Sequence, residues 1–282
     1  MSARTSEVPA RQVDSATADE LRDVNERLLL AGLKAQEQAE LEIKLRAEAE
    51  AALAMRDEFI SIAAHELRTP VTAIKASAQL TLRKLGEATP DNERIVRYQL
   101  GILDGANRLV SLINDLMDVS RMRSGELQLH VTPIDLVVLV SAVALRYTET
   151  GGERHRVTTD VPAASLVVAG DAGRLEQILD NLLSNAVKYS PAGGEIGVRL
   201  RQADDGIVLT VSDSGIGLPP GAQERIFEPF GRALNATRQR LPGMGLGLHI
   251  CRQIARAHGG RMWAESAGEG QGMTVGLWLP PL

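Results

Sequence analysis

The strongest candidate for a reactive side chain is His65, within residues 59–70, FISIAAHELRTP. Free imidazole titrates close to neutral pH, so much of it is uncharged and nucleophilic under cellular conditions. Glu66 follows directly and can accept or orient the ring proton, although successive helix positions do not face each other squarely. Pro70 removes a helix hydrogen bond and is expected to bend the helix just past His65. An imidazole in this setting can accept a phosphoryl group, although a lone histidine in a helix is more often structural.

A second group of polar side chains lies in residues 180–189, DNLLSNAVKY. Asn181, Asn185 and Lys188 follow i, i+4 and i+7 spacing, which places them near one face of a helix. Two carboxamides and a cation on one face suit a Mg²⁺-triphosphate, because Mg²⁺ takes oxygen ligands. Taken alone, two Asn on a helix are more often solvated surface.

A third candidate is Asp213 in residues 211–217, VSDSGIG, at the end of an expected strand. Its carboxylate can accept a hydrogen bond from an exocyclic amine such as that of adenine. Gly215 and Gly217 allow the backbone to come close to a ligand. By itself this short pattern is only a weak turn signal.

Residues 243–248, GMGLGL, open an expected helix, where free N–H groups and the positive end of the dipole favour phosphate. No strand precedes them and no βαβ unit surrounds them, so the glycine pattern does not predict a dinucleotide fold. Residues 231–242 before them are polar, contain Arg232, Arg238 and Arg240, and are poor in apolar anchors. This segment is predicted to be a mobile lid, the alternative being an idle surface loop.

Two helical regions come before these motifs. Residues 1–17 are predicted to be a disordered lead-in, and residues 18–55 a single long helix rich in Ala, Glu, Leu, Lys and Arg. The apolar seam of that helix breaks at Gln38 and Glu42 and resumes on a shifted phase, as in a stutter. We expect a parallel two-helix coiled-coil signalling stalk, and a solvated single helix is the alternative.

Residues 56–124 carry two amphipathic helices, one continuing to Leu82 and one at about 93–122, joined by a turn-rich loop. One hairpin buries its apolar stripe poorly, whereas two hairpins make a four-helix bundle. The pattern therefore predicts an all-α dimerisation domain and a homodimer.

From Gly125 to Leu282 the pattern changes to short β-rich runs broken by Gly and Pro, with helices between them. Strands are expected at 126–132, 154–161, 166–169, 195–202, 207–212, 260–266 and 272–279, and helices at 136–148, 172–189 and 246–258. Helices on one face of a mixed sheet predict an α+β sandwich as a separate domain.

The motifs jointly resemble those of sensor histidine kinases over about residues 56–282. FISIAAHELRTPVTAI resembles the H box, the similarity continuing in LVSLINDLMDVSRMRSG, and residues 180–189 resemble the N box. Residues 211–217 and 226–230, IFEPF, resemble the first glycine box and the F box, and residues 243–248 the second glycine box. The resemblance implies a histidine phosphoacceptor domain followed by a Bergerat-fold ATP-binding domain.

The same resemblance assigns roles to residues. It implies ATP-dependent phosphorylation of His65 helped by Glu66, Mg²⁺ on Asn185, and transfer of the phosphoryl group to an aspartate of a response regulator receiver domain. Thr69, three positions after Glu66, matches the phosphatase pattern of the family; its alternative role is a hydrogen bond to its own helix. The implied ATP-binding residues are Asn181, Asn185, Lys188, Tyr189, Asp213, Gly215, Gly217, Phe230, Arg232, Gly243, Gly245, Leu246 and Gly247.

Composition limits the partners and the compartment. A formal charge of -5 and 3% aromatic residues argue against a nucleic-acid surface. The single cysteine, Cys251, allows no intrachain disulfide, and the start of the chain lacks a secretory signal, so we expect a cytoplasmic protein. Any membrane link is expected through a missing sensor part or a partner.

Two rivals remain at this point. A degenerate scaffold would dimerise and hold nucleotide without transferring phosphate. An ATPase or serine kinase of the same nucleotide-binding fold would have no need of an acceptor histidine in a dimerising hairpin. The stimulus, the cognate regulator, and whether His65 is phosphorylated by its own or the other subunit are not encoded in these motifs.

Overall fold

The computed structural model describes residues 15–85, 91–124, 128–150, 154–239, 241 and 243–282. The chain divides into two compact units, residues 1–61 and residues 62–282. One helix, α1 (Ser15–Leu85), begins in the first unit and ends in the second, with Pro70 inside it. No helix in the described ranges is long and apolar enough to cross a membrane.

The described part of the first unit is helical. Leu28, on the predicted seam before its break, and Leu41, where the seam is predicted to resume on a shifted phase, are 64% and 57% exposed. Ion pairs one turn apart, Arg27 with Asp23 and Arg46 with Glu50, add the modest support that such pairs give to an exposed helix. The long helix expected for residues 18–55 is confirmed, whereas the coiled coil stays a prediction. The lead-in prediction for residues 1–17 lies largely outside the described residues.

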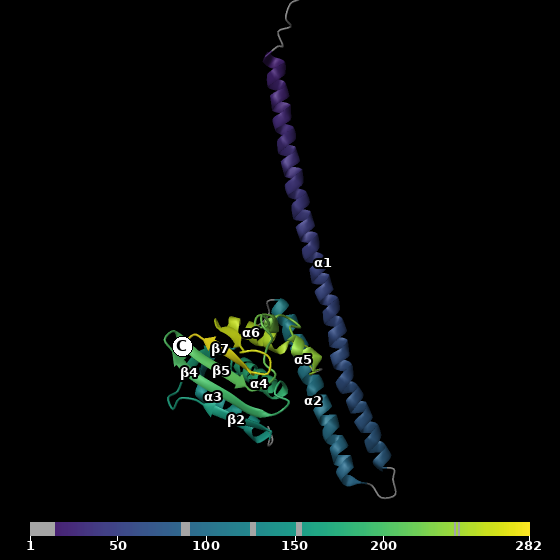
Figure 1. Ribbon diagram of the computed structural model, residues 1–282, viewed down its shortest axis with the longest axis vertical. Coiled ribbons are helices and arrows are strands. Elements are labelled where there is room, and N and C mark those ends of the chain that lie inside the picture. The colour runs from purple at the N-terminus through teal and green to yellow at the C-terminus, as the bar shows by residue number, and fades with distance from the viewer. Residues whose placement is uncertain (1–14, 86–90, 125–127, 151–153, 240, 242) are drawn as a thin grey trace, which may run out of the picture. The chain divides into compact units, whose positions relative to one another are not determined.

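The second unit begins with a hairpin of the last part of α1 and α2 (Asn92–Arg123), which lie side by side in Figure 1. Asp91 caps α2 by accepting a hydrogen bond from the Arg94 backbone N–H. The helices approach closely at Gly105, where an added Cβ would lie 2.7 Å from Ile74 Cγ1. The predicted hairpin is confirmed, with α2 within a residue of the expected bounds.

The rest of the second unit is a sheet covered by helices (Figure 1). The five-stranded sheet has the order β2-β4-β5-β7-β6, with β2 and β4 parallel and the other neighbours antiparallel. The strands are β2 (His155–Asp160), β4 (Gly194–Ala203), β5 (Gly206–Asp213), β6 (Arg261–Glu265) and β7 (Met273–Leu279). The helices α3 (Leu136–Thr150), α4 (Ala172–Lys188) and α6 (Gly247–Ala257) form the second layer. The predicted α+β sandwich is confirmed.

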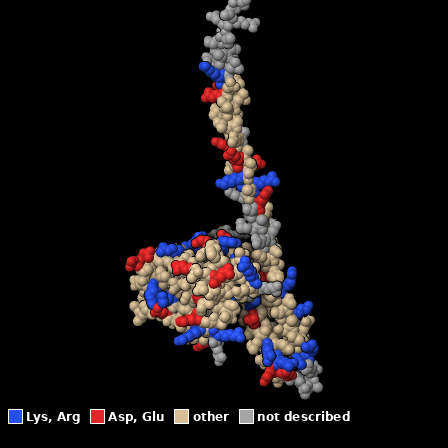
Figure 2. Space-filling view, in the orientation of Figure 1, with Lys and Arg blue, Asp and Glu red and all other residues tan. Residues whose placement is uncertain are grey.

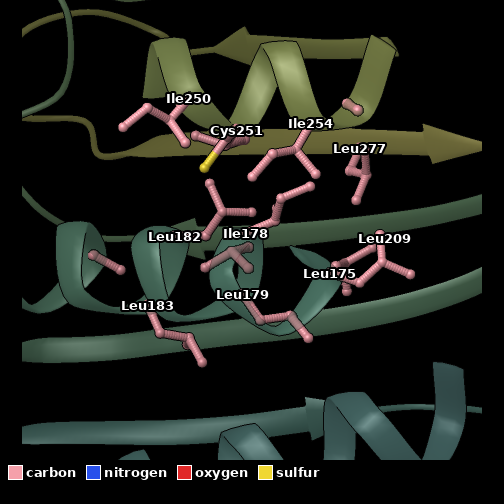
Figure 3. Packing of buried hydrophobic residues seen from close by; sticks show 14 of the residues in the cluster. Leu175, Ile178, Leu179, Leu182, Leu183, Leu209, Ile250, Cys251, Ile254 and Leu277 are labelled. Carbon is pink, nitrogen blue, oxygen red and sulfur yellow. The ribbon is translucent and has the colours of Figure 1, made fainter. Parts of the chain in front are cut away.

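The core of this sandwich lies between the helices and the sheet. Figure 3 shows Ile178 and Leu182 of α4 pointing toward Cys251 and Ile254 of α6, with Leu209 of β5 alongside. Ile178, Cys251 and Ile254 are each 0% exposed. Because the apolar residues of α4 recur at three-four spacing, one face enters this core and the other remains available for polar side chains.

Three local predictions are wrong or incomplete. The strand expected at 126–132 is absent from residues 128–131; instead β1 (Thr132–Asp135) pairs antiparallel with β3 (Val167–Gly170). Pro133 and Asp135 have low β-propensity, so the pairing with β3 decides the conformation there. The short helices η1 (Arg225–Phe227) and α5 (Leu234–Arg238) were not predicted.

Charged side chains are distributed without a single-sign field on the face seen in Figure 2. Lys and Arg are interspersed with Asp and Glu over the sandwich and the hairpin on that face. This mixture is ordinary for a protein surface and gives no sign of a surface built to neutralise a phosphate backbone.

Candidate functional site

His65 and Glu66 differ in exposure although they are neighbours on α1. His65 is exposed, whereas the side chain of Glu66 is 13% exposed and its Oε2 lies 3.5 Å from Nη2 of Arg108 on α2. The Thr69 hydroxyl is exposed and donates a hydrogen bond to the carbonyl oxygen of His65 at 3.3 Å. Thr69 thus makes the bond to its own helix that was the alternative to a phosphatase role.

The polar face of α4 borders a central cavity of about 340 Å³, a size ordinary for a small-molecule site. Asp171 caps the first turn of α4 by accepting from the Arg174 backbone N–H, and buried Leu and Ile side chains fix the rotation of the helix. The predicted site residues that line the central cavity are Glu66, Asn181, Asn185, Lys188, Tyr189, Asp213, Gly217, Arg232, Gly243, Gly245, Leu246 and Gly247.

The other predicted site residues lie near the central cavity without lining it. Gly215 supports Asp213 by donating its backbone N–H to Oδ1 at 2.9 Å. A Cβ at Gly215 would lie 2.1 Å from the Tyr189 carbonyl oxygen, so a larger residue would push these segments apart. Phe230 has a φ of 61° and its backbone lies against Gly245. His65 and Thr69 do not line the cavity either.

One end of the central cavity carries a half-buried carboxylate. Asp213 ends β5 opposite Met273, and burial raises the pKa of its carboxyl above the ordinary value, while the Gly215 N–H opposes that rise. Because the carboxylate faces the cavity, it can accept a hydrogen bond from an amino group of a bound ring. This end suits the base of a nucleotide.

The other end is cationic. Lys188 Nζ donates to the Tyr189 hydroxyl at 2.8 Å, and a Cβ at Gly243 would lie 2.7 Å from the same Nζ. Helix α6 begins at Gly247, and no side chain caps its first turn. Free N–H groups at a helix N-terminus favour anions, so this end suits phosphate groups. Gly247 also leaves room for Asn181, whose Oδ1 would lie 2.4 Å from a Cβ there.

The residues present fit a Mg²⁺ that also binds phosphates. Asn185, whose carboxamide includes an oxygen able to bind a metal, lines the cavity, and the described ranges contain no group of three His, Cys, Asp or Glu side chains able to hold a metal without a ligand. Mg²⁺ is commonly held by one or two protein oxygens together with substrate phosphates and water. The donor chemistry therefore suits a metal that arrives with the nucleotide.

The predicted lid is anchored more firmly than its sequence suggested. Its helix α5 buries Ala236 and Asn235, which are 2% and 5% exposed, and Asn235 Nδ2 donates to the Gly217 carbonyl oxygen at 2.9 Å. The Arg232 guanidinium donates to the Leu241 carbonyl oxygen. The prediction that this segment lacks anchors is wrong, because Ala and Asn were not counted as core residues. Arg240 and Pro242 lie outside the described residues.

Helix α2 also forms part of the wall of the central cavity. The sequence predicted the helix but not this position beside the cavity. Arg108, Leu112 and Asp115 line it, and burial raises the pKa of Asp115 to about 6, with the nearby Asp118 carboxylate adding to the rise. Asp118 is 6% exposed and accepts a hydrogen bond from Arg174 Nη1 on α4 at 2.8 Å. Periodicity placed these residues on a helix, but which helix faces the cavity depends on tertiary packing.

Two protein families match successive, separate parts of the chain. Residues 55–125 match the His Kinase A (phospho-acceptor) domain. Residues 170–282 match the family of histidine kinase-, DNA gyrase B- and HSP90-like ATPases. The first match contains His65, and the second contains Asn185, Asp213 and the glycines of the central cavity.

Known proteins extend this similarity over most of the chain. The sensor histidine kinase WalK of Bacillus subtilis is 34% identical over 228 residues, which are 80% of this chain and 36% of WalK. The sensor-like histidine kinase SenX3 of Mycobacterium tuberculosis (strain H37Rv) is 35% identical over 232 residues, 81% of this chain and 55% of SenX3. The chain spans about a third to about half of the length of these relatives.

A solved structure, full-length ShkA in complex with AMPPNP, aligns with a TM-score of 0.57 at 28% identity. The alignment covers 80% of this chain and 46% of ShkA. The two family matches, their order along the chain and the relatives agree with the architecture of a helical hairpin followed by a mixed-sheet sandwich. The chain therefore belongs to the sensor histidine kinases and carries their phospho-acceptor and ATPase domains.

Proposed function

We propose that this chain transfers the γ-phosphoryl group of ATP to His65. The observation that carries the proposal is that Glu66, the neighbour of His65, lies in the wall of the same cavity as Asn185 and Asp213. A cavity with a carboxylate at one end and a cation with a helix N-terminus at the other matches the polarity of a nucleoside triphosphate. Asp213 is proposed to bind the base and Lys188 the phosphates.

In this reaction the protein contributes mainly position and charge, as in other phosphoryl transfers. Asn185 would hold Mg²⁺, which neutralises charge on the phosphates. Glu66 is proposed to take the proton from the ring nitrogen of His65 that does not attack. Gly243 and Gly245 would let the backbone approach the phosphates, since both adopt a positive φ.

The direct test is incubation with γ-labelled ATP and Mg²⁺. We expect label on the parent and none on His65→Gln, while His130→Gln, at an exposed histidine outside the central cavity, keeps the parental level. The label should be lost in acid and survive base, as phosphohistidine does. Equal labelling of His65→Gln would contradict the assignment, and an unlabelled parent that still binds ATP would favour the scaffold reading.

A second test concerns the metal. Asn185→Ala should leave folding intact and reduce Mg²⁺-dependent labelling by about a hundred-fold, the scale of lost charge stabilisation at a reacting phosphate. Gln202→Ala, which removes a carboxamide from an exposed position on β4 outside the central cavity, serves as the control. Retained labelling with a normal Mg²⁺ requirement would show that Asn185 is not the ligand.

We further propose that the phosphoryl group passes from His65 to an aspartate of a response regulator, and that the chain acts as a homodimer. The dimer is supported by apolar residues of α2 that this chain leaves exposed, such as Leu100 and Leu103 at 59% and 56%. Phosphatase activity toward the regulator is proposed for Thr69, which lies exposed one turn after His65.

A further inference from the structure

Arg108 connects the two hairpin helices beside the phosphoacceptor. Its Nη2 lies 3.5 Å from Glu66 Oε2, and its side chain is 37% exposed against 13% for Glu66. Both residues belong to the hairpin, so the contact depends on the packing of α1 against α2. In the described state the carboxylate that follows His65 is therefore engaged by a cation on the opposite helix.

This contact holds Glu66 away from its proposed task. Glu66 lies in the groove toward α2, whereas His65 is exposed on the next helix position, about 100° around the helix. The guanidinium and the imidazole N–H compete for the same carboxylate oxygens. Proton acceptance from His65 thus requires that Arg108 release Glu66.

Arg108 also faces a place where an anion is expected. It lines the central cavity, whose wall also includes the cation Lys188 and the proposed Mg²⁺ ligand Asn185. A guanidinium carries five N–H donors in a fork that matches phosphate oxygens, and the contact to Glu66 at 3.5 Å is a long one. A phosphoryl group bound in the central cavity offers Arg108 more negative charge than one carboxylate does.

We propose that Arg108 is a further catalytic residue: it binds the γ-phosphoryl group of ATP and, in doing so, releases Glu66 to accept the proton of His65. The proposal rests on the proposed function and adds a substrate-triggered release to it. Glu66 stays paired in the absence of a γ-phosphoryl group. ADP, which lacks that group, leaves the pair in place.

The transfer of the γ-phosphoryl group from ATP to His65 conserves atoms, electrons and charge. One ring nitrogen of neutral His65 forms a bond to the γ-phosphorus, and the bond from that phosphorus to the bridging oxygen breaks with its electron pair going to ADP. The proton on the other ring nitrogen passes to Glu66, which becomes neutral. Arg108 remains charged throughout and stays with the transferred group, whose charge it partly offsets.

The test measures nucleotide affinity and does not require turnover. Equilibrium dissociation constants for ADP and for a non-hydrolysable ATP analogue, both with Mg²⁺, give the preference for the γ-phosphoryl group. We expect Arg108→Ala to lose this preference by about ten-fold or more while its affinity for ADP stays parental, the scale of a charge-assisted hydrogen bond. Arg108→Lys, which keeps the charge without the fork, should keep part of the preference.

The matched control is Arg97→Ala. Arg97 is an exposed arginine on α2, eleven residues or about three turns before Arg108, and lies outside the central cavity. The Arg97→Ala variant loses the same charge from the same helix, and its preference for the ATP analogue over ADP should equal that of the parent. A preference lost equally in both variants would indicate a general charge effect and overturn the proposal.

Glu66→Gln should change the preference for the ATP analogue in the opposite direction to Arg108→Ala. Without the carboxylate, Arg108 is not held back, so the preference for the ATP analogue over ADP should rise above the parental value. In the Arg108→Ala background the same substitution should no longer change the preference, because the two residues act as a pair. Additive effects of the two substitutions would contradict the release model.

The outcomes separate this proposal from the proposed function. If Arg108→Ala keeps the parental preference and labels His65 normally but unfolds at a lower temperature, Arg108 only ties the hairpin together, and the proposal fails while the kinase function stands. If the parent does not label His65, the proposed function fails, yet a lost preference in Arg108→Ala still shows that Arg108 binds the γ-phosphoryl group.

Discussion

The hairpin and the sandwich treat their apolar side chains differently. Helix α2 leaves Leu103 and Val110 56% and 57% exposed, whereas Ile178 and Ile250, on helices of the sandwich, are each 0% exposed. Both regions have amphipathic helices, but α4 and α6 face a sheet and each other, while α2 contacts α1 and, in its last part, the helices of the sandwich. A two-helix hairpin cannot enclose both of its stripes.

The difference indicates which region depends on a second chain. The sandwich closes its core within one chain and carries most of the residues proposed to bind nucleotide. The hairpin exposes a seam on α2 at Val96, Leu100, Leu103, Val110 and Met117, spaced by four, three, seven and seven residues, with Asn107 and Asn114 at the intermediate positions of the bundle pattern. The proposed phosphoacceptor, His65, thus lies on the region proposed to need a partner, and the residues proposed to bind nucleotide lie mainly on the region that closes its own core.

The largest expected effect is on assembly. The double change Leu100→Lys and Leu103→Lys should convert the proposed dimer into a 30.3 kDa monomer, because each chain would bury two charges at the seam. Light scattering gives the mass, and titration with ADP should show unchanged nucleotide binding. Val138→Lys is the matched control, since Val138 of α3 is an exposed apolar residue (65%) outside the hairpin. A parent that is already a monomer at micromolar concentration would remove the contrast between the two regions.

The next effect tests the core of the sandwich. Ile178→Ala should lower the free energy of unfolding by about 2–5 kcal/mol, because it opens a cavity between α4, α6 and the sheet. Denaturant unfolding followed by circular dichroism measures the loss. Val138→Ala, at an exposed site, should change stability by less than about 0.5 kcal/mol. Equal losses in the two variants would show that the sandwich core is less closed than described.

A smaller, pH-dependent effect is expected at Asp115, where the two regions meet. Its raised pKa of about 6 means that the folded state holds a proton which the unfolded state releases near pH 4. The carboxyl therefore costs stability increasingly as pH rises from about 4 to about 6, and the full cost remains above that range. Asp115→Asn should stabilise the protein by up to about 3 kcal/mol at pH 7.5 and by clearly less at pH 5.

Thermal unfolding at the two pH values measures this difference. Asp104→Asn, on the exposed side of the same helix, is the control and should give the same shift at both. A pH-independent effect of Asp115→Asn would mean that Asp115 is not buried against the sandwich in solution. The hairpin and the sandwich would then be more independent than their contacts at Asp118 and Arg174 indicate.

The parts of the fold that the sequence predicted are those set by local periodicity. Helices α2, α4 and α6 and strands β4 and β5 lie within a residue or two of the expected bounds, because each repeats its apolar residues regularly and ends at turn residues. Strand β1 could not be predicted, since Thr132–Asp135 has no β pattern and its conformation comes from pairing with β3. Helix α5 is too short for a periodic signal.

The residues of the candidate site also divide into those that the sequence predicted and those that only tertiary packing brings to the site. Motif residues such as Asn185 and Asp213 were found because their spacing and resemblance point to chemistry. Arg108 and Asp115 were missed, because on the sequence they are ordinary charged residues of an amphipathic helix. The sequence offers one signal for Arg108, a charged residue on the side of α2 that faces α1. Its proposed role becomes visible only in the structure, where it contacts Glu66 on the other helix.

The smallest expected effect concerns Thr69, for which two roles have been considered: phosphatase activity and a hydrogen bond to its own helix. Its hydroxyl donates to the His65 carbonyl oxygen at 3.3 Å, a long bond at an exposed position, so little energy holds it there and rotation toward a docked regulator is easy. Thr69→Ala should keep labelling of His65 and transfer to the regulator near parental levels. It should slow dephosphorylation of the regulator by about ten-fold, because a group that orients the hydrolytic water is lost.

Thr72→Ala tests whether this effect is specific. The Thr72 hydroxyl donates to the Arg68 carbonyl oxygen at 2.8 Å and is also exposed, so the control removes the same type of helix bond three residues further along. Three residues turn the helix by about 300°, which places Thr72 roughly 60° away from Thr69 around α1 and about 4.5 Å farther along it. If both variants slow dephosphorylation equally, the hydroxyls act through the helix. If Thr69→Ala alone slows it, the exposed side of the hairpin that carries His65 also contributes to dephosphorylation, and the contrast between the two regions extends to catalysis.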